Sequence, residues 1–247
     1  MAAFVLVHGS MHGGWCWRRV APLLRAAGHE AYAPTLTGLG ERAHLAHPGI
    51  DLDTHVRDVL GVLEYEDLDR VVLVGHSYGA LVVTGVADRV PERIAHLVYL
   101  DGAEAGDGQA VLDFFPPEGQ AARRALVDAE GDGWRLPPPA DLTGFGVTAE
   151  EDVAWVRPKL VPQPFKTFTQ PLRLVNAAGF AGPKTFVACV EAPAAGWREA
   201  MAERARAGPG WRYRELATGH DAMVTAPRQL ADLLLAAARA APTPPAP

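Results

Sequence analysis

Residues 71–83 read Val71-Val72-Leu73-Val74-Gly75-His76-Ser77-Tyr78-Gly79-Ala80-Leu81-Val82-Val83. An apolar run typical of a buried strand is followed by a G-x-S-x-G motif and then by an apolar helical segment. A serine on so sharp a strand-to-helix turn needs glycine on both sides, because a Cβ atom there would collide with the neighbouring backbone. The chain has two serines, Ser10 and Ser77, and 25 glycines in 247 residues, so chance would produce this motif only roughly 0.02 times. The stretch therefore predicts a nucleophile elbow that exposes the Ser77 hydroxyl at the carboxyl edge of a sheet.

Other apolar runs indicate the rest of that sheet. Short buried strands alternate with helical patterns, which is typical of βαβ units and of a doubly wound, mainly parallel sheet. We therefore expect an α/β fold with six strands, at residues 3–7, 29–33, 70–74, 94–100, 185–190 and 211–216.

Residues 103–183 interrupt this alternation. The segment is rich in proline, glycine and aromatic residues. Structureless loops of that length are rare in compact domains, so we expect a mostly helical cap inserted after the fourth strand. Residues 1–102 and 184–241 would then form the core domain, and we expect the proline-rich residues 242–247 to be disordered.

Aromatic side chains in the cap have two interpretations. Most would form the small core of the cap itself, and the others would line an apolar pocket beneath it. We expect a substrate pocket lined by Phe114, Phe115 and Trp155 of the cap, together with His12 and Trp15.

A base and an acid must accompany the serine, because serine is a weak nucleophile at neutral pH. His220 lies between the last expected strand and the final helix, which is where the base of such a fold is found. Asp101 follows the fourth strand and Glu191 follows the fifth, and either carboxylate could orient the imidazole. We favour Asp101, because its short side chain starts beside the strand of Ser77 and would hold the ring more rigidly.

The loop after the first strand supplies the expected oxyanion hole. It reads His8-Gly9-Ser10-Met11-His12-Gly13-Gly14-Trp15 and opens a helix, so its backbone N–H groups are free to point at an anion. We expect the N–H of Ser10, or alternatively that of Met11, to act together with the N–H of Tyr78. A phosphate-binding loop is the rival interpretation, but neither G-x-G-x-x-G nor G-x-x-x-x-G-K occurs here.

The composition excludes several other classes of function. The formal net charge is -6, from 23 Lys+Arg and 29 Asp+Glu, and no basic run occurs, which disfavours a nucleic-acid partner. Cys16 and Cys189 are the only cysteines, and no cluster has metal-ligand spacing, so we expect neither a metal nor a cofactor. No apolar run reaches membrane-spanning length, and the first residues leave no room for a signal peptide. We expect a cytoplasmic monomer or homodimer whose partner is a small-molecule substrate.

A family resemblance rests on three motifs, which are His8-Gly9-x-x-His12-Gly13-Gly14-Trp15, Gly75-His76-Ser77-Tyr78-Gly79 and Gly219-His220. They resemble those of the small α/β-hydrolases that include plant methylesterases, the salicylate-binding methylesterase and the hydroxynitrile lyases. Through residues 35–42 and 217–223 the chain is also similar to bacterial esterases of that group which hydrolyse carbamate and pyrethroid pesticides. The likeness covers nearly the whole chain outside the cap, and it implies a parallel sheet under a helical cap.

Two positions depart from that family pattern. In the plant members the triad aspartate lies a few residues beyond the strand that ends here at Val190, whereas this chain has Glu191 and no aspartate there. The acid has therefore moved. In the lyases a lysine directly after the catalytic histidine assists the departing cyanide, but here Asp221 occupies that position.

These observations predict a serine hydrolase that cleaves a small apolar carboxylic ester or carbamate through an acyl-enzyme. A hydroxynitrile lyase on the same scaffold is one alternative; Asp221 disfavours it, and cyanide release from a cyanohydrin would reveal it. A non-catalytic receptor for a small ligand is another. Ser77 and His220 argue against a receptor, and turnover would exclude it.

Overall fold

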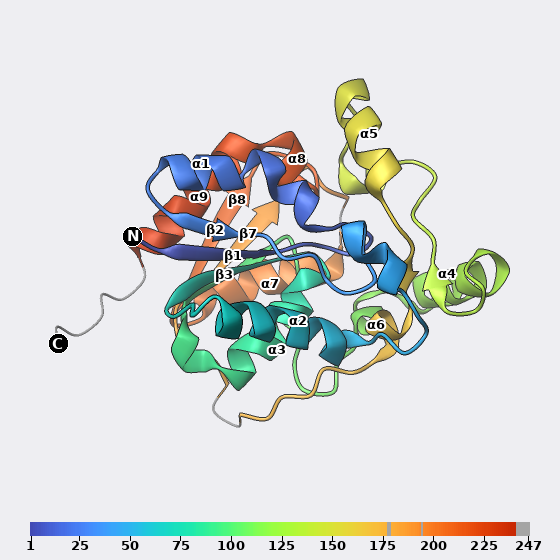
Figure 1. Cartoon of the computed structure of the whole chain (residues 1–247), viewed down its shortest axis with the longest axis horizontal. Coiled ribbons are helices and arrows are strands. Elements are labelled where there is room, and N and C mark those ends of the chain that lie inside the picture. The colour runs from blue at the N-terminus through green and yellow to red at the C-terminus, as the bar shows by residue number, and fades with distance from the viewer. Residues whose placement is uncertain (177–178, 194, 241–247) are drawn as a thin grey trace.

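A computed structural model describes residues 1–176, 179–193 and 195–240. Its central sheet has six strands in the order β2-β1-β3-β4-β7-β8 (Figure 1). Every neighbouring pair in this sheet is parallel, which confirms the predicted fold class. The strands are β1 (Ala3–Val7), β2 (Glu30–Tyr32), β3 (Val71–His76), β4 (Ile94–Leu100), β7 (Lys184–Cys189) and β8 (Trp211–Leu216).

Helices cover both faces of the sheet (Figure 1). Alternate strand residues point to opposite faces, so Val71 and Leu73 of β3 join one apolar cluster while Val72 and Val74 join the other. The first cluster packs against α2, α3 and α7, and the second against α1 and α9. The core helices are α1 (Ala21–Ala26), α2 (Leu52–Tyr65), α3 (Gly79–Arg89), α7 (Gly196–Ala207), α8 (Ala222–Thr225) and α9 (Pro227–Arg239), with 3-10 helices η1 (Gly14–Arg19), η2 (Gly40–Leu45) and η3 (Pro91–Arg93).

The segment between β4 and β7 is less helical than expected. Within the described residues α4 is its one long helix, and two short strands pair antiparallel beside it. Prolines 137–139, 158, 162 and 164 explain the difference, because proline lacks the N–H that a helix interior needs. The elements are η4 (Val111–Phe114), α4 (Pro117–Glu130), β5 (Arg135–Leu136), η5 (Thr143–Phe145), α5 (Glu150–Val156), η6 (Arg157–Lys159), β6 (Gln163–Pro164) and α6 (Lys166–Thr169). We call this segment the cap.

The C-terminal tail and the absence of a membrane-spanning segment were two further expectations from the sequence. The tail expected to be disordered, residues 242–247, lies outside the described residues. Within the described residues, no helix combines the length and the apolar character that crossing a membrane requires.

Candidate active site

Ser77 stands on a tight turn between β3 and α3. Its φ of +51° lies in the left-handed region, which costs a residue other than glycine about 1–3 kcal/mol. A Cβ atom added to Gly75 would lie 2.5 Å from the carbonyl oxygen of Gly79, and one added to Gly79 would lie 2.7 Å from that of His8. Both glycines are therefore required for the backbone to close this turn.

Asp101 leaves the neighbouring strand at the same level as Ser77. The pairing of β3 with β4 ends at His76 opposite Leu100, so the next residue of each strand reaches the carboxyl edge together. The Ser77 N–H donates to the Leu100 carbonyl at 3.0 Å. Asp101 also has a positive φ, of +41°. Two strained residues thus follow two adjacent strands at one edge of the sheet.

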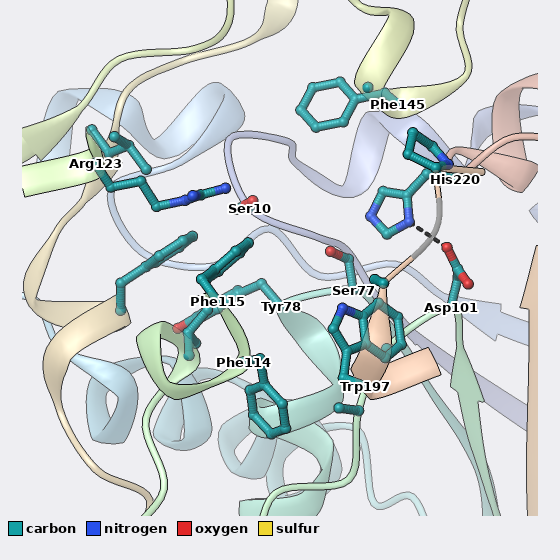
Figure 2. Close-up of a pocket in the computed structure, with 18 of the residues that line it drawn as sticks. Ser10, Ser77, Tyr78, Asp101, Phe114, Phe115, Arg123, Phe145, Trp197 and His220 are labelled. Atoms are coloured by element: carbon teal, nitrogen blue, oxygen red, sulfur yellow. Dashed lines mark hydrogen bonds and ion pairs between the residues drawn. The ribbon is translucent and has the colours of Figure 1, made fainter. Parts of the chain in front are cut away.

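His220 contacts this acid. The distance from its Nδ1 to Oδ2 of Asp101 is 2.5 Å, and the Asp101 side chain is fully buried. Figure 2 shows the imidazole between Asp101 and the Ser77 hydroxyl, with the ring and the hydroxyl both facing the pocket. Ser77, Asp101 and His220 all line one cavity. A neutral imidazole held through Nδ1–H leaves Nε2 free to accept a proton.

The Asp101 carboxylate has further donors. Arg198 of α7 binds both of its oxygens, with Nε 2.6 Å from Oδ1 and Nη2 2.8 Å from Oδ2. The Cys189 N–H lies 3.3 Å from Oδ1. Burial alone would raise the pKa of Asp101, but the hydrogen bonds from His220 and Arg198 outweigh it and lower this pKa from 3.8 to about 2. The carboxylate is therefore ionised throughout the neutral pH range.

Glu191, the other candidate acid, is placed differently. Its side chain is exposed to solvent just after β7, and its backbone N–H donates to the Thr218 carbonyl at 3.1 Å. Among the described carboxylates, Asp101 is the one within hydrogen-bond distance of His220 Nδ1. The geometry thus brings Ser77 and His220 together with the favoured candidate.

The loop after β1 presents two free donors to the cavity. Ser10, Met11 and Tyr78 all line it, but the Met11 N–H donates to Oε1 of the cap residue Gln163 at 2.8 Å. No acceptor among the described residues binds the N–H of Ser10 or of Tyr78. Of the two alternatives considered for this loop, the geometry therefore favours Ser10.

The cavity has a volume of about 790 Å³ and lies between the sheet edge and the cap. Its lining is largely apolar and includes Phe114, Phe115, Phe145, Phe168 and Trp197. Figure 2 shows four of these rings, those of Phe114, Phe115, Phe145 and Trp197. Phe114 and Phe115 thus both line the cavity that Ser77 and His220 also line. His12, Trp15 and Trp155 are not among the lining residues, so their assignment to the pocket requires correction.

Packing explains why those three side chains lie elsewhere. The Trp155 ring is 5.6 Å from that of Trp15, edge to face, and the Arg19 guanidinium lies 4.4 Å from its centroid. His12 stacks on Trp15 at 5.3 Å. These contacts form an aromatic cluster of His12, Trp15 and Trp155 that serves packing.

A buried ion pair lies behind His220. Nε2 of His12 is 3.0 Å from Oδ2 of Asp221, and both side chains are almost completely buried. Nδ1 of His12 is 2.7 Å from the Ser10 carbonyl, so both ring nitrogens face acceptors, as an imidazolium requires. Burial lowers the pKa of His12, but Asp221 outweighs burial and raises it overall. Burial raises the pKa of Asp221, and His12 reverses that effect, so the net direction is downward.

This arrangement links the loop after β1 to the loop that carries His220. His76 also contacts the latter loop, with Nε2 3.0 Å from the His220 carbonyl. Burial lowers the pKa of His76 to about 3, so this ring is neutral and donates to that carbonyl. Asp221 is fully buried and does not line the cavity.

Three side chains of the site were missed in the sequence. Gln163 binds the loop after β1, Arg198 binds Asp101, and Arg123 lines the cavity. None stands in a motif, and each reaches the site from the cap or from a helix distant in sequence. No group of described His, Cys, Asp and Glu residues has a geometry that could hold a metal ion.

Comparison with known proteins gives consistent findings. A family model described as "Alpha/beta hydrolase family" matches residues 4–233. The chain is 43% identical over 249 residues to the carbendazim hydrolyzing esterase of Nocardioides sp. (strain SG-4G). This match covers 96% of this chain and 99% of the relative. It is 38% identical over 108 residues to Methylesterase 1 of Arabidopsis thaliana, covering 39% of this chain and 38% of the relative.

A solved structure extends these comparisons to the fold. An extracellular alpha/beta-hydrolase from a Paenibacillus species, described as sharing structural and functional homology with tobacco salicylic acid binding protein 2, matches with a TM-score of 0.85. The two chains are 26% identical, and the match covers 96% of this chain and 99% of the other. The resemblance indicated by the sequence motifs is confirmed.

Proposed function

This chain belongs to the alpha/beta hydrolase family, and on that premise we propose that it is a serine esterase that cleaves small, largely apolar carboxylic esters or carbamates. One observation carries the proposal. His220 Nδ1 lies 2.5 Å from the buried Asp101 carboxylate, at the same cavity that the Ser77 hydroxyl faces. An ionised acid, a held imidazole and a serine on an elbow are the parts that acyl transfer requires.

Acylation follows from this arrangement. Oγ of Ser77 attacks the carbonyl carbon of the ester while Nε2 of His220 takes the hydroxyl proton. The resulting imidazolium is stabilised by the Asp101 carboxylate. The oxyanion accepts hydrogen bonds from the N–H groups of Ser10 and Tyr78, which have no other acceptor among the described residues. The His220 proton then passes to the departing alcohol, and the acyl group remains on Ser77.

Deacylation repeats these steps with water. His220 removes a proton from the water molecule that attacks the acyl carbon, and it returns that proton to Oγ of Ser77 as the acid leaves. A carbamate substrate follows the same route through a carbamoylated serine. The apolar lining of the cavity favours uncharged, hydrophobic groups over most of its surface.

A fluorophosphonate probe tests the nucleophile directly. The probe should label the chain at one site per molecule, and mass spectrometry of the labelled peptides should place it on Ser77. Ser77→Ala should abolish labelling and ester hydrolysis together while circular dichroism stays unchanged. Labelling at Ser10, or hydrolysis by Ser77→Ala, would contradict the proposal.

A substrate panel identifies the acyl and alcohol groups. The relative named for carbendazim hydrolysis makes carbendazim a necessary member of the panel, together with p-nitrophenyl esters of graded chain length and aryl carbamates. We expect ester or carbamate turnover that depends on Ser77. Cyanide release from a cyanohydrin without ester hydrolysis would instead support a lyase, and binding without turnover would support a receptor.

A further inference from the structure

One cationic side chain stands in the apolar part of the cavity, away from the three proposed catalytic residues. Arg123 lies on α4 of the cap and lines the cavity. Figure 2 shows its side chain reaching from the cap toward the cavity interior, on the side of Ser10. Its guanidinium carbon is 3.6 Å from the centroid of the Phe115 ring, so an aromatic face supports it on one side.

Arg123 has no anionic partner among the described residues. Its one hydrogen bond there goes from Nη1 to the Gly119 carbonyl, at 3.0 Å within the same helix. The cavity's carboxylate, Asp101, is engaged by Arg198 and His220. Burial lowers the pKa of Arg123, and no neighbouring charge opposes that effect. The remaining N–H donors of the guanidinium therefore face the cavity with their charge uncompensated.

An uncompensated charge in an apolar cavity favours an anionic ligand. A half-buried cation loses part of its hydration, and a matching anion restores the lost interaction. A guanidinium also presents its N–H groups in a planar fork that fits the two oxygens of a carboxylate. A hydrogen bond to a charged group is worth more than one to a neutral acceptor.

We infer that Arg123 is a specificity-determining residue that binds a carboxylate of the substrate, so that the preferred substrates include half-esters of dicarboxylic acids. This inference rests on the proposed esterase function, because it names the substrate class of the same site. The ester group lies at Ser77, the intervening methylene groups contact the apolar lining, and the free carboxylate meets Arg123 beside Phe115.

Two esters of equal shape test the inference. The mono-4-nitrophenyl ester of glutaric acid ends in a carboxylate, and 4-nitrophenyl 5-methylhexanoate ends in an isopropyl group of similar size. We expect Arg123→Met to lower the ratio of kcat/KM for the acidic ester over the apolar ester by about 10- to 100-fold. Arg123→Gln serves as a second variant if Arg123→Met does not fold. Either variant keeping the wild-type ratio would overturn the inference.

The neighbouring residue provides a matched control. Arg124 is on the same helix, is exposed and does not line the cavity, so Arg124→Met removes the same charge from the same element. In Arg124→Met the ratio of kcat/KM for the acidic ester over the apolar ester should remain within about twofold of the wild-type value. A fall as large as that of Arg123→Met would show a long-range charge effect and would also overturn the inference.

A binding measurement separates this inference from the proposed function. Titration calorimetry on Ser77→Ala compares the affinities of monomethyl glutarate and methyl 5-methylhexanoate, with and without Arg123→Met. The selectivity for the acidic ester should depend on Arg123 even if the wild-type chain hydrolyses neither compound, an outcome that would refute the esterase alone. Hydrolysis that depends on Ser77, combined with Arg123-independent affinities, would refute only the present inference.

Discussion

Arg198 binds Asp101 through both carboxylate oxygens, with Nε 2.6 Å from Oδ1 and Nη2 2.8 Å from Oδ2. The same carboxylate accepts the hydrogen bond of His220 at 2.5 Å. A single buried group thus connects α7 of the core to the histidine loop. The pair fixes the orientation of the acid, since a bidentate contact permits little rotation of the carboxylate.

The identity of the triad acid can be tested with a pair of isosteric substitutions. Asp101→Asn should lower kcat by about 10³- to 10⁴-fold, because an amide facing Nδ1 favours the wrong imidazole tautomer. Glu191→Gln should cost about tenfold or less, since its side chain is exposed. Steady-state kinetics on one p-nitrophenyl ester measures both. The opposite ranking would assign the acid to Glu191, and large losses in both would mean that the two carboxylates share the role.

Replacement of Arg198 should raise the pH at which the protein unfolds on acidification. The pKa of Asp101 is lowered from 3.8 to about 2 in the folded protein. The ionised carboxylate therefore contributes fully to stability above pH 3.8, and this contribution is lost as the pH falls through about 2. Arg198→Met removes two of the bonds that offset burial, so the pKa of Asp101 rises and that contribution is lost at a higher pH. Acid titration followed by circular dichroism measures the shift.

The same helix offers a control for that experiment. Arg206 forms an exposed ion pair with Glu215 at 3.4 Å, and such pairs contribute about 0–1 kcal/mol. Arg206→Met should leave the acid midpoint close to that of the wild type. An equal shift in both variants would indicate a general charge effect and would remove the special role of Arg198.

Local signals made the sheet and the elbow predictable. Apolar runs identified β1, β3, β4 and β7, because a buried parallel strand needs apolar residues on both faces. The turn at Ser77 was visible because the backbone there accepts only glycine at two positions. Asp101 followed from topology, because the ends of adjacent parallel strands meet at one edge.

Long-range contacts account for what the sequence could not predict. The bond from Met11 to Gln163 joins residues 152 positions apart, and that from Arg198 to Asp101 joins residues 97 apart. No periodicity records such contacts. Trp155 illustrates the same limit, since an aromatic residue in a cap has equal sequence signals whether it faces the cavity or, as here, packs on Trp15. The direction of a cap side chain depends on loops that proline and glycine can fold in several ways.

The buried pair of His12 and Asp221 should make a large, pH-dependent contribution to stability. Removing one partner of such a pair typically costs about 3–5 kcal/mol, so Asp221→Asn should lower the free energy of unfolding by that amount near about pH 6. The pKa of His12 is raised in the folded state, so protonated His12 stabilises the fold. This stabilisation is complete below pH 6.5, the ordinary pKa of histidine, and is lost as the pH rises through the pKa of His12 in the folded state. The difference between wild type and variant should therefore shrink toward high pH.

Urea unfolding at about pH 5, 7 and 9 measures this dependence. Glu215→Gln, which breaks an exposed pair, should change the free energy of unfolding by about 1 kcal/mol or less at each pH. A difference between wild type and Asp221→Asn that is constant across the series would mean that His12 is not protonated in the native state.

The cap aromatics should divide into one that governs substrate size and one that governs packing. Phe114 lines the cavity, so Phe114→Ala enlarges the space available to an acyl chain. It should raise the ratio of kcat/KM for p-nitrophenyl octanoate over butanoate by about tenfold, the effect expected for one or two methylene groups. Trp155 lies outside the lining and packs on Trp15 and Arg19. Trp155→Ala should therefore lower Tm while keeping that ratio within about twofold. If instead Trp155→Ala alone shifted the chain-length preference, the cavity would have to extend to the aromatic cluster of His12, Trp15 and Trp155.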